Sequence, residues 1–328
     1  MAPTLGVLIT YYNEREMLTE CLESLLANTE LPDEILVYDD ASDYPAQDYT
    51  PDHPLIRVVR GERNGGLIYA RNALLERATS DYLHFHDADD WFMPTWTEAV
   101  RRAAASGPDL IFTMGDYLKD GRQKPLYMAG YLDLLRENFK LFSVERGFNS
   151  SCLTFHRRLL EKVGLLRTDS ITGSSQYFYP EDFYYGALLA YKSQRCTVLE
   201  ESLYLYRVRS GSLSIDGQGL LRPEMRIGRM RALMELSALY PQWASRFADL
   251  IAKQAWTVVP FNKKVAAEGF TFAHSLGNPS YSWIGQPWRA IARTLGPMTA
   301  YRLFHMYAHP SLVAVRGRIK TFIKGQTP

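Results

Sequence analysis

Cysteines are scarce in this sequence. Cys21, Cys152 and Cys196 are the three cysteines among 328 residues, and none has a partner at CxxC spacing. This pattern excludes the common zinc-binding and dithiol redox motifs. An odd number of widely separated cysteines indicates reduced thiols buried in a core.

Long apolar runs are also missing. No stretch reaches the roughly 18 consecutive apolar residues of a membrane-spanning helix. The first apolar stretch, residues 5–12, has no basic residues before it and is followed at once by charges, unlike a signal peptide. We therefore expect a cytoplasmic protein, and we interpret the glycosylation sequon at Asn149-Ser150-Ser151 as coincidental.

Acidic residues are absent from residues 269–328, which carry seven Lys or Arg, whereas residues 1–268 carry 30 basic and 36 acidic residues. Within this basic tail, residues 312–324 place apolar and basic side chains on adjoining faces of a predicted helix: Leu312, Val315, Ile319, Phe322 and Ile323 beside Arg316, Lys320 and Lys324. Such a helix suits peripheral contact with the inner face of an anionic membrane, and it equally suits packing on the body of the protein. No nucleic-acid-binding motif accompanies the basic residues, so we expect no nucleic-acid partner.

The first 115 residues alternate short apolar runs with helical patterns. The runs cover residues 5–11, 35–38, 56–59, 82–86 and 109–114. This alternation predicts an α/β fold with a mostly parallel sheet flanked by helices. After the first run we expect a helix that starts at Asn13, with Asn13 as its cap and Glu16 completing a capping box. Ligands of such sheets bind beyond the carboxyl ends of the strands, so the segments after each run form the candidate site.

The second half of the chain is less regular. Residues 168–180 are rich in Ser, Thr and Gly and predict a long loop, residues 181–192 predict a helix, and residues 197–208 predict one or two strands. From about residue 220 the pattern is helical without strands. We therefore predict a domain over residues 1–220 and a C-terminal helical extension over residues 221–328 that ends in the basic tail.

Carboxylates gather directly after two of the runs. Asp87-Ala88-Asp89-Asp90 follow residues 82–86, and Asp39-Asp40 follow residues 35–38. Burying several carboxylates at a strand end is costly without a cation. Mg²⁺ or Mn²⁺, held by one or two of them together with phosphate oxygens, explains the first group. A polar turn that caps the next helix is the alternative.

A glycine turn, Asn64-Gly65-Gly66, precedes a helical segment that carries Arg71. A turn of this kind at a helix N-terminus suits the close approach of a phosphate or a base. The chain has neither a Walker loop nor a GxGxxG motif, which removes the two commonest explanations of nucleotide binding.

Taken in order, these segments resemble the family-2 glycosyltransferases of the GT-A fold over roughly residues 4–215. The matching segments are VLITYYNE (7–14), VYDDASD (37–43), NGGLIYARN (64–72), DADDWFMP (87–94), the Glu181-Asp182 pair and YRVRSGSLS (206–214). The resemblance implies inverting transfer of a sugar from a nucleotide diphosphate donor, with uridine as the expected base, to a hydroxyl of a glycan or lipid-linked glycan in surface polysaccharide biosynthesis. Residues 1–115 would then form the nucleotide-sugar half of the catalytic domain and residues 116–220 its acceptor half.

The resemblance also implies roles for single residues. Thr10, Asp39 and Arg71 would contact the base, Asp87 the ribose side of the donor, and Asp89 together with Asp87 the metal, while Asp90 would be structural. The remaining donor-binding positions in the matching segments are Tyr12, Asn13, Asp40, Asn64, Gly65, Ala88, Arg207, Arg209 and Ser212.

The Glu181-Asp182 pair matches the place of the family's catalytic base. An inverting transfer needs one carboxylate to accept the proton of the acceptor hydroxyl. We assign this role to Asp182, with Glu181 as the alternative. Acidic residues also favour the first turn of a helix through the helix dipole, which explains both residues without catalysis.

The sequence departs from the family at Arg209, where many relatives have a histidine. A guanidinium does not ligate a cation, but it pairs bidentately with phosphate. We therefore expect Arg207 and Arg209, with Ser212, to stabilise the departing diphosphate.

Two rival functions remain open at this point. One is a noncatalytic module of the same fold that binds nucleotides or glycans. The other is a sugar nucleotidyltransferase, which would carry a Gly-rich basic loop where this chain has TYYNE.

Overall fold

The computed structural model describes residues 2–119, 121–127, 129–167, 181–208 and 222–308. The chain divides into two compact units, residues 1–228 (unit 1) and residues 229–328 (unit 2). The predicted loop over residues 168–180 and the predicted tail helix over residues 312–324 lie outside the described residues.

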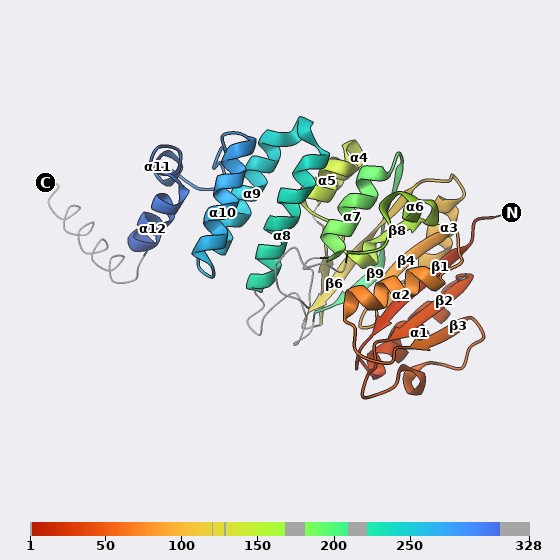
Figure 1. Ribbon diagram of the computed structural model, residues 1–328. Coiled ribbons are helices and arrows are strands. Elements are labelled where there is room, and N and C mark those ends of the chain that lie inside the picture. The colour runs from red at the N-terminus through yellow and green to blue at the C-terminus, as the bar shows by residue number, and fades with distance from the viewer. Residues whose placement is uncertain (1, 120, 128, 168–180, 209–221, 309–328) are drawn as a thin grey trace, which may run out of the picture. The chain divides into compact units, whose positions relative to one another are not determined.

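Unit 1 is built around a nine-stranded mixed sheet with the order β3-β2-β1-β4-β8-β6-β9-β5, in which β7 pairs with β6 (Figure 1). The strands are β1 (Leu5–Tyr11), β2 (Glu34–Asp39), β3 (Ile56–Arg60), β4 (Tyr82–Asp87), β5 (Trp91–Phe92), β6 (Leu110–Lys119), β7 (Arg122–Pro125), β8 (Leu153–His156) and β9 (Cys196–Arg207). The α-helices are α1 (Glu16–Leu26), α2 (Leu67–Arg77), α3 (Trp96–Ala104), α4 (Ala129–Glu137), α5 (Phe139–Glu145), α6 (Leu160–Val163) and α7 (Glu181–Lys192).

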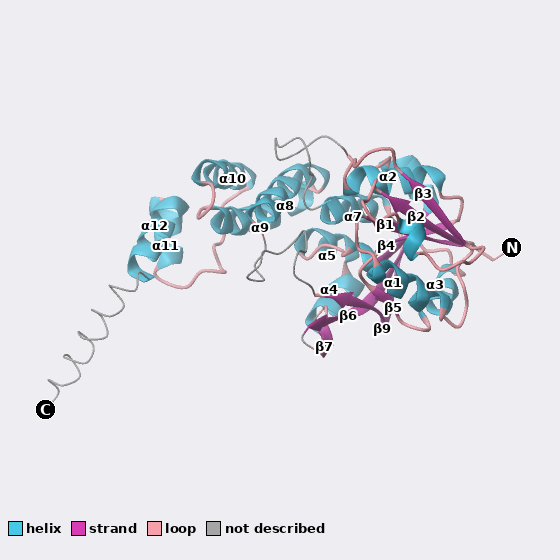
Figure 2. Cartoon of the chain, turned by 90° about the horizontal axis from the view of Figure 1, so that it is seen from below, coloured by secondary structure: helices cyan, strands magenta, loops and turns pink. Residues whose placement is uncertain are grey.

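The first four strands of the sheet order are parallel and covered on both faces. β1 pairs in parallel with β2 and β4, and β2 pairs in parallel with β3. Along β1, Val7 and Ile9 join an apolar cluster with α1 and α3, whereas Leu8 joins a second cluster with α2 and α7. Figure 2 shows these helix pairs on opposite sides of the strands. Strands buried on both faces read as continuous apolar runs, and the predicted α/β class with a mostly parallel sheet is confirmed.

The rest of the sheet introduces antiparallel pairs. β8 runs antiparallel to β4 and β6, and β6 runs parallel to β9 with register shifts on either side of Met114. A Cβ atom at Gly115 would lie 2.0 Å from Cε1 of Tyr204, so the Tyr204 ring fills the space where a side chain would stand. β6 continues through residue 115, and the two predicted halves of the catalytic domain therefore share this strand.

The prediction that the first helix starts at Asn13 is wrong. α1 begins at Glu16, and Asn13 and Arg15 adopt left-handed backbone conformations, with φ of 67° and 52°. Asn13 donates its backbone N–H to Ser42 Oγ (3.1 Å) and accepts from the Tyr44 N–H through Oδ1 (3.2 Å). Asn tolerates the left-handed region, and here it joins the turn after β1 to the turn after β2 instead of capping the helix.

Unit 2 is helical in the part of it that the structure describes. Helix α8 (Pro223–Leu236) leads into it, followed by α9 (Ala244–Val258), α10 (Lys263–Leu276), α11 (Trp288–Leu295) and α12 (Pro297–Ala308). Phe247, Ile251 and Ala255 of α9 are fully buried, and α9 packs along α10. The predicted C-terminal helices are confirmed. Across the described ranges of the chain, each helix is too short or too polar to cross a bilayer.

Two buried histidines, His84 and His86, lie in β4, next to the acidic turn formed by residues 87–90. His84 Nδ1 is 3.0 Å from Thr154 Oγ1, and its ring centroid lies 4.5 Å from that of Trp96. Burial lowers the pKa of His84 to about 3, and it lowers the pKa of His86 as well. The folded chain therefore holds His84 in its neutral form.

We predict a histidine contribution to acid unfolding. The unfolded chain binds a proton at His84 near pH 6.5, so the stability that neutral His84 contributes is fully present above that pH and is lost as the pH falls toward 3. This group alone lowers the free energy of unfolding by about 1.4 kcal/mol per pH unit within that window. Urea unfolding of wild type and His84→Gln between pH 7 and 4 measures the difference, and equal pH slopes would contradict the prediction.

Candidate active site

Several predicted site residues meet at the carboxyl edge of the parallel strands. In the strand register Thr10 lies beside Asp87, Tyr11 beside Asp39, and Asp39 beside Arg60. The strand order reverses direction between β1 and β4, and such a switch point is where open α/β sheets bind their ligands.

Asp39 is buried and already paired within the protein. Its Oδ1 accepts from the Ser42 N–H (2.8 Å), and its Oδ2 accepts from the Ala46 N–H (2.9 Å) and from Arg60 Nη1 (2.5 Å). The Arg60 side chain is 45% exposed, whereas that of Asp39 is 1% exposed. The cation at this position is therefore more accessible than the carboxylate for which the base contact was predicted.

Asp40 organises the glycine turn. Its two carboxylate oxygens accept from the N–H groups of Gly65 (2.8 Å) and Gly66 (2.7 Å), and Asn64 Oδ1 also accepts from Gly66 (3.1 Å). The two amides that we expected to face a phosphate are thus bound to a carboxylate. A donor contact from Asn64 or Gly65 would have to use other atoms.

Tyr12 is the most exposed of the predicted donor contacts at the end of β1. Its side chain is 48% exposed, and two further tyrosines are exposed nearby in the chain: Tyr44 after β2 and Tyr69 in the first turn of α2. An exposed ring at a strand end offers a flat apolar surface, which is the kind of surface on which a nucleobase stacks.

The acidic turn after β4 contains carboxylates of two kinds. Asp87 and Asp89 are partly exposed, whereas Ala88 and Asp90 are buried. Asp90 accepts from the Arg207 backbone N–H through Oδ1 (2.8 Å), and its Oδ2 has no hydrogen-bond partner among the described residues. Burial, reinforced by Asp87 and Asp89, raises the pKa of Asp90 well above its usual range. Asp90 is therefore placed to shape the turn and faces away from solvent.

Arg207 of β9 binds this turn through its side chain. Its Nε donates to the Asp89 carbonyl oxygen (2.8 Å), its Nη2 pairs with Glu20 of α1, and its guanidinium carbon lies 3.6 Å from the centroid of the Trp91 ring. The guanidinium is thus engaged on three sides by protein groups. The predicted partners of Arg207 at the diphosphate, Arg209 and Ser212, lie outside the described residues.

Arg71 is the buried centre of the site. Its Nη1 donates to Glu181 Oε1 (2.9 Å), and its Nη2 donates to Asp87 Oδ1 (3.2 Å) and to Ser150 Oγ (3.1 Å). The side chain is 4% exposed and lies over the Phe85 ring. One guanidinium therefore ties β4 to the start of α7 and to the short 3₁₀ turn η2 (Ser150–Cys152).

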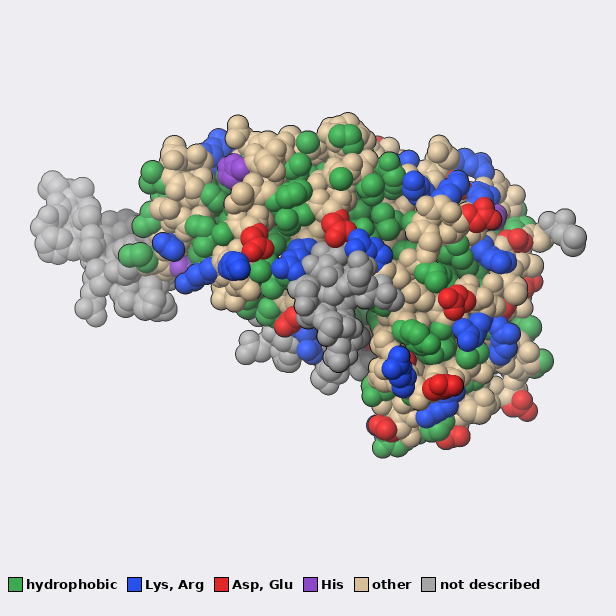
Figure 3. Space-filling view, viewed as in Figure 1, with side chains coloured by type: hydrophobic (Ala, Val, Ile, Leu, Met, Phe, Trp, Pro, Cys, Tyr) green, Lys and Arg blue, Asp and Glu red, His purple; other side chains and the backbone are tan. Residues whose placement is uncertain are grey.

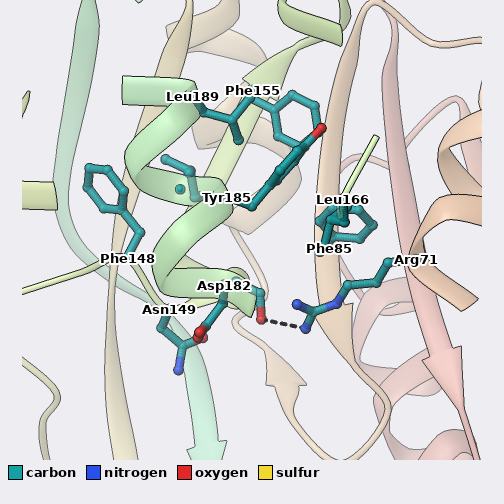
Figure 4. A pocket seen from close by; sticks show the side chains of 12 residues that line it. Arg71, Phe85, Phe148, Asn149, Phe155, Leu166, Asp182, Tyr185 and Leu189 are labelled. Atoms are coloured by element: carbon teal, nitrogen blue, oxygen red, sulfur yellow. Dashed lines mark hydrogen bonds between the residues drawn. The ribbon is translucent and has the colours of Figure 1, made fainter. Parts of the chain in front are cut away.

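The predicted catalytic pair opens α7, as expected. Glu181 is buried against Arg71, and burial raises its pKa to about 7 despite the opposing effect of that guanidinium. Asp182 is more exposed than Glu181 and accepts from the Phe183 N–H through Oδ1 (2.7 Å). Figure 4 shows Asp182 at the start of the helix and Arg71 across from it, and the dashed line from Arg71 is its hydrogen bond to Ser150. Asp182 and Arg71 both line a small hollow of about 20 Å³. The two acids thus have different surroundings: Glu181 is buried against Arg71, and Asp182 is more exposed.

A divalent cation fits the chemistry of the acidic turn. Burial raises the pKa of Asp87, and the carboxylates of Asp89 and Asp182 raise it further, against the effect of Arg71. Negative charge is therefore in excess here. In the described part of the chain no three His, Cys, Asp or Glu side chains form a ready-made cage. Mg²⁺ and Mn²⁺ in nucleotide sites commonly use one or two carboxylates, with phosphate oxygens completing the shell, so Asp87 and Asp89 suffice.

Sequence reasoning missed the residues that hold the predicted ones in place. Ser150, Arg60 and Glu20 each bind a predicted site residue through side-chain contacts. Ser150 stands within the sequon that we interpreted as coincidental, and no motif marks any of the three. The contacts join residues that are 21 to 187 positions apart, beyond the reach of a local pattern.

Comparison with known proteins agrees with this geometry. The Glycosyl transferase family 2 model matches residues 6–164. The chain is 27% identical over 227 residues to "Uncharacterized glycosyltransferase EpsJ" of Bacillus subtilis (strain 168), covering 65% of this chain and 64% of the relative. It is also 27% identical over 228 residues to "Succinoglycan biosynthesis protein ExoO" of Rhizobium meliloti (strain 1021), covering 65% and 63%. The matches therefore span a little less than two thirds of these relatives.

Solved structures share the fold at lower identity. S. aureus TarS 1–349 in complex with UDP-GlcNAc superposes with a TM-score of 0.62 at 17% identity, covering 94% of this chain and 92% of TarS. The mannosyltransferase PcManGT from Pyrobaculum calidifontis, in complex with GDP-Man and Mn²⁺, gives 0.56 at 17% identity, covering 94% and 88%. The GT-A-like α/β architecture is thus shared, and residues 6–164 match the Glycosyl transferase family 2 model.

Proposed function

We propose that this protein is an inverting glycosyltransferase. It transfers a sugar from a nucleotide diphosphate donor, a UDP-sugar, to a hydroxyl of a glycan or lipid-linked glycan in surface polysaccharide biosynthesis at the cytoplasmic face of the membrane. The match to the Glycosyl transferase family 2 model and the names of the relatives support the reaction class. The observation that carries the proposal is the Arg71 bridge, because it joins the acidic turn to the acidic start of α7 in one site.

The proposed base is Asp182. It accepts the proton of the acceptor hydroxyl while that oxygen forms a bond to the anomeric carbon, and the bond from that carbon to the diphosphate oxygen breaks with its electron pair on the nucleoside diphosphate. Glu181 is less suited to this task because it is buried and hydrogen-bonded to Arg71. Glu181 instead holds Arg71 in place.

Asp89, with Asp87, would hold Mn²⁺ or Mg²⁺. The cation would supply positive charge to neutralise the departing diphosphate. The Mn²⁺ named with GDP-Man in the structure of PcManGT, which shares this fold, supports a metal here. Asp90 and Arg207 act on the turn itself, because they fix its backbone from β9.

The donor base is assigned to the edge formed by β1 and β2. Thr10 and Tyr12 offer a hydroxyl and an exposed ring there, and Asn13, Asp39 and Asp40 shape the turns around them. Arg71 is buried among protein groups. We therefore propose that it positions the carboxylates, in place of the contact with the nucleotide base that the resemblance implied.

Thermal-shift screening of nucleotide sugars with Mn²⁺ tests the function as a whole. A ligand at 100 times its dissociation constant adds about 2.7 kcal/mol of stability. Assays of sugar transfer and donor hydrolysis, with Mn²⁺ or with EDTA, then separate an enzyme from a binding module. Stabilisation by UDP-sugars without turnover would favour the noncatalytic module, and turnover of a sugar phosphate with a nucleoside triphosphate would favour the nucleotidyltransferase.

For the metal, we predict that Asp89→Ala abolishes the metal-stimulated part of UDP binding, because the carboxylate facing the cation is removed. Calorimetric titration of the protein with UDP, in the presence of Mn²⁺ or of EDTA, measures the affinity for UDP under each condition. Asp52→Ala, which removes an exposed carboxylate before β3, is the matched control and should bind as wild type. Equal UDP affinity of the wild type in Mn²⁺ and in EDTA would contradict the metal assignment.

For the positioning role, we predict that Arg71→Met lowers the free energy of unfolding by about 3–5 kcal/mol, because it leaves buried carboxylates without their partner. Arg71→Met combined with Glu181→Gln should recover part of that loss. The exposed ion pair of Arg102 with Glu98 is the control, and Arg102→Ala should lower the free energy of unfolding by about 0–1 kcal/mol. Chemical denaturation measures all three, and wild-type stability of Arg71→Met would refute the bridge as a structural tie.

For the base, we predict that Asp182→Asn keeps donor affinity and lowers turnover by about 10²–10⁴, because the amide keeps the shape of the side chain but accepts no proton. Steady-state kinetics and UDP calorimetry measure the two effects. Glu181→Gln is the matched comparison: near-normal transfer by Asp182→Asn with loss in Glu181→Gln would exchange the roles. If both variants stayed active, the helix dipole would explain why the two acids open α7, and the catalytic base would be another residue.

A further inference from the structure

The two units carry opposite charge. Residues 229–328 hold 13 Lys or Arg and three Asp or Glu, a formal charge of +10, whereas residues 1–228 hold 24 and 33, a formal charge of −9. A positive charge of this size on about 100 residues attracts an anionic partner over several ångströms. The question is which folded surface of unit 2 meets that partner.

Exposed apolar side chains point to α11 and α12. Leu295 is 64% exposed, Leu303 is 37% exposed and Met306 is 61% exposed. Along α12, the exposed residues Thr299, Arg302, Leu303 and Met306 follow the i, i+3, i+4, i+7 spacing of a single helix face. Figure 3 shows hydrophobic and basic side chains next to one another over this part of unit 2.

A hollow of about 440 Å³ adjoins this face. It is lined by Phe270 and His274 of α10 and by Leu295, Pro297 and Met298 at the junction of α11 and α12. Thr299 borders both the hollow and the exposed face of α12. The hollow and the exposed face of α12 therefore adjoin at Thr299.

The arginines beside it are held by backbone carbonyl groups. Arg293 donates to the Ser280 carbonyl oxygen (2.7 Å) and Arg289 donates to the Ser282 carbonyl oxygen (2.9 Å), so both are fixed by the backbone and keep their charge. No Asp or Glu occurs after Glu268. Apolar side chains flanked by arginines match an anionic lipid bilayer, in which acyl chains lie beneath phosphate headgroups.

We propose that the exposed face of α11 and α12, with the adjoining hollow, docks on an anionic membrane surface. Leu303 and Met306 enter the boundary between headgroups and acyl chains, and Arg302 and Arg293 meet the headgroup phosphates. This surface belongs to the described helices and is distinct from the tail over residues 312–324. It stands apart from the glycosyl transfer proposed above, because binding to lipid is measured without any sugar substrate.

Vesicle co-sedimentation of the full chain tests the surface. Wild type should bind vesicles of phosphatidylcholine with 30% phosphatidylglycerol, and binding should weaken with salt and be lost on phosphatidylcholine alone. The double variant Leu303→Glu/Met306→Glu should bind at least about tenfold more weakly. Arg302→Gln should weaken binding about fivefold, the effect of one basic residue. Circular dichroism and thermal unfolding check that both variants remain folded.

Matched controls lie in unit 1. Leu165→Glu introduces the same charge at a leucine that is 42% exposed, and Arg122→Gln removes an exposed arginine of β7. Both should bind anionic vesicles as wild type does. Wild-type binding by the folded double variant, or equal wild-type binding to neutral and anionic vesicles, would overturn the proposal. Concentration-dependent self-association that the double variant abolishes, without lipid binding, would assign this face to a second copy of the chain and overturn it as well.

Discussion

The arrangement of the site depends on one buried cation, Arg71. Its guanidinium contacts Asp87 of β4, Glu181 of α7 and Ser150 of the η2 turn, at 4% side-chain exposure. A charge buried to this extent is tolerated only when its partners stay in place. The strand that carries the acidic turn and the helix that carries the proposed base are therefore held in a fixed relation by electrostatics as well as by packing.

This constraint explains why neighbouring carboxylates have different properties. Glu181 neutralises Arg71 and lies buried, whereas Asp182 is turned toward a more exposed position one residue later. Asp90 is buried under the turn, whereas Asp87 and Asp89 are partly exposed beside it. In each group the buried acid is engaged by an arginine side chain or by an arginine backbone N–H, whereas the more exposed acid keeps a side that solvent reaches.

The sequence predicted β1, β2, β3, β4, β6 and β9 and the edge where the candidate residues meet, because buried strands leave continuous apolar runs. It did not predict the short strands β5, β7 and β8. It also predicted that Glu181 and Asp182 open a helix. It did not predict that Arg71 is buried, since an arginine on a helix is usually solvated and its partners lie far away in the chain. Asn13 was assigned as a helix cap because capping residues also favour left-handed turns, and the local pattern does not distinguish the two.

The two units also differ in the groups that bind their arginines. In unit 1 arginines such as Arg71, Arg60 and Arg158 are each matched to a buried carboxylate, so their charge is used inside the fold. In unit 2 Arg289 and Arg293 are held by backbone carbonyls, and their charge is not neutralised by those contacts. Positive charge that the fold does not neutralise remains available to an external anion. The proposed metal site and the proposed lipid-binding surface are thus two consequences of how each part of the chain satisfies its own charges.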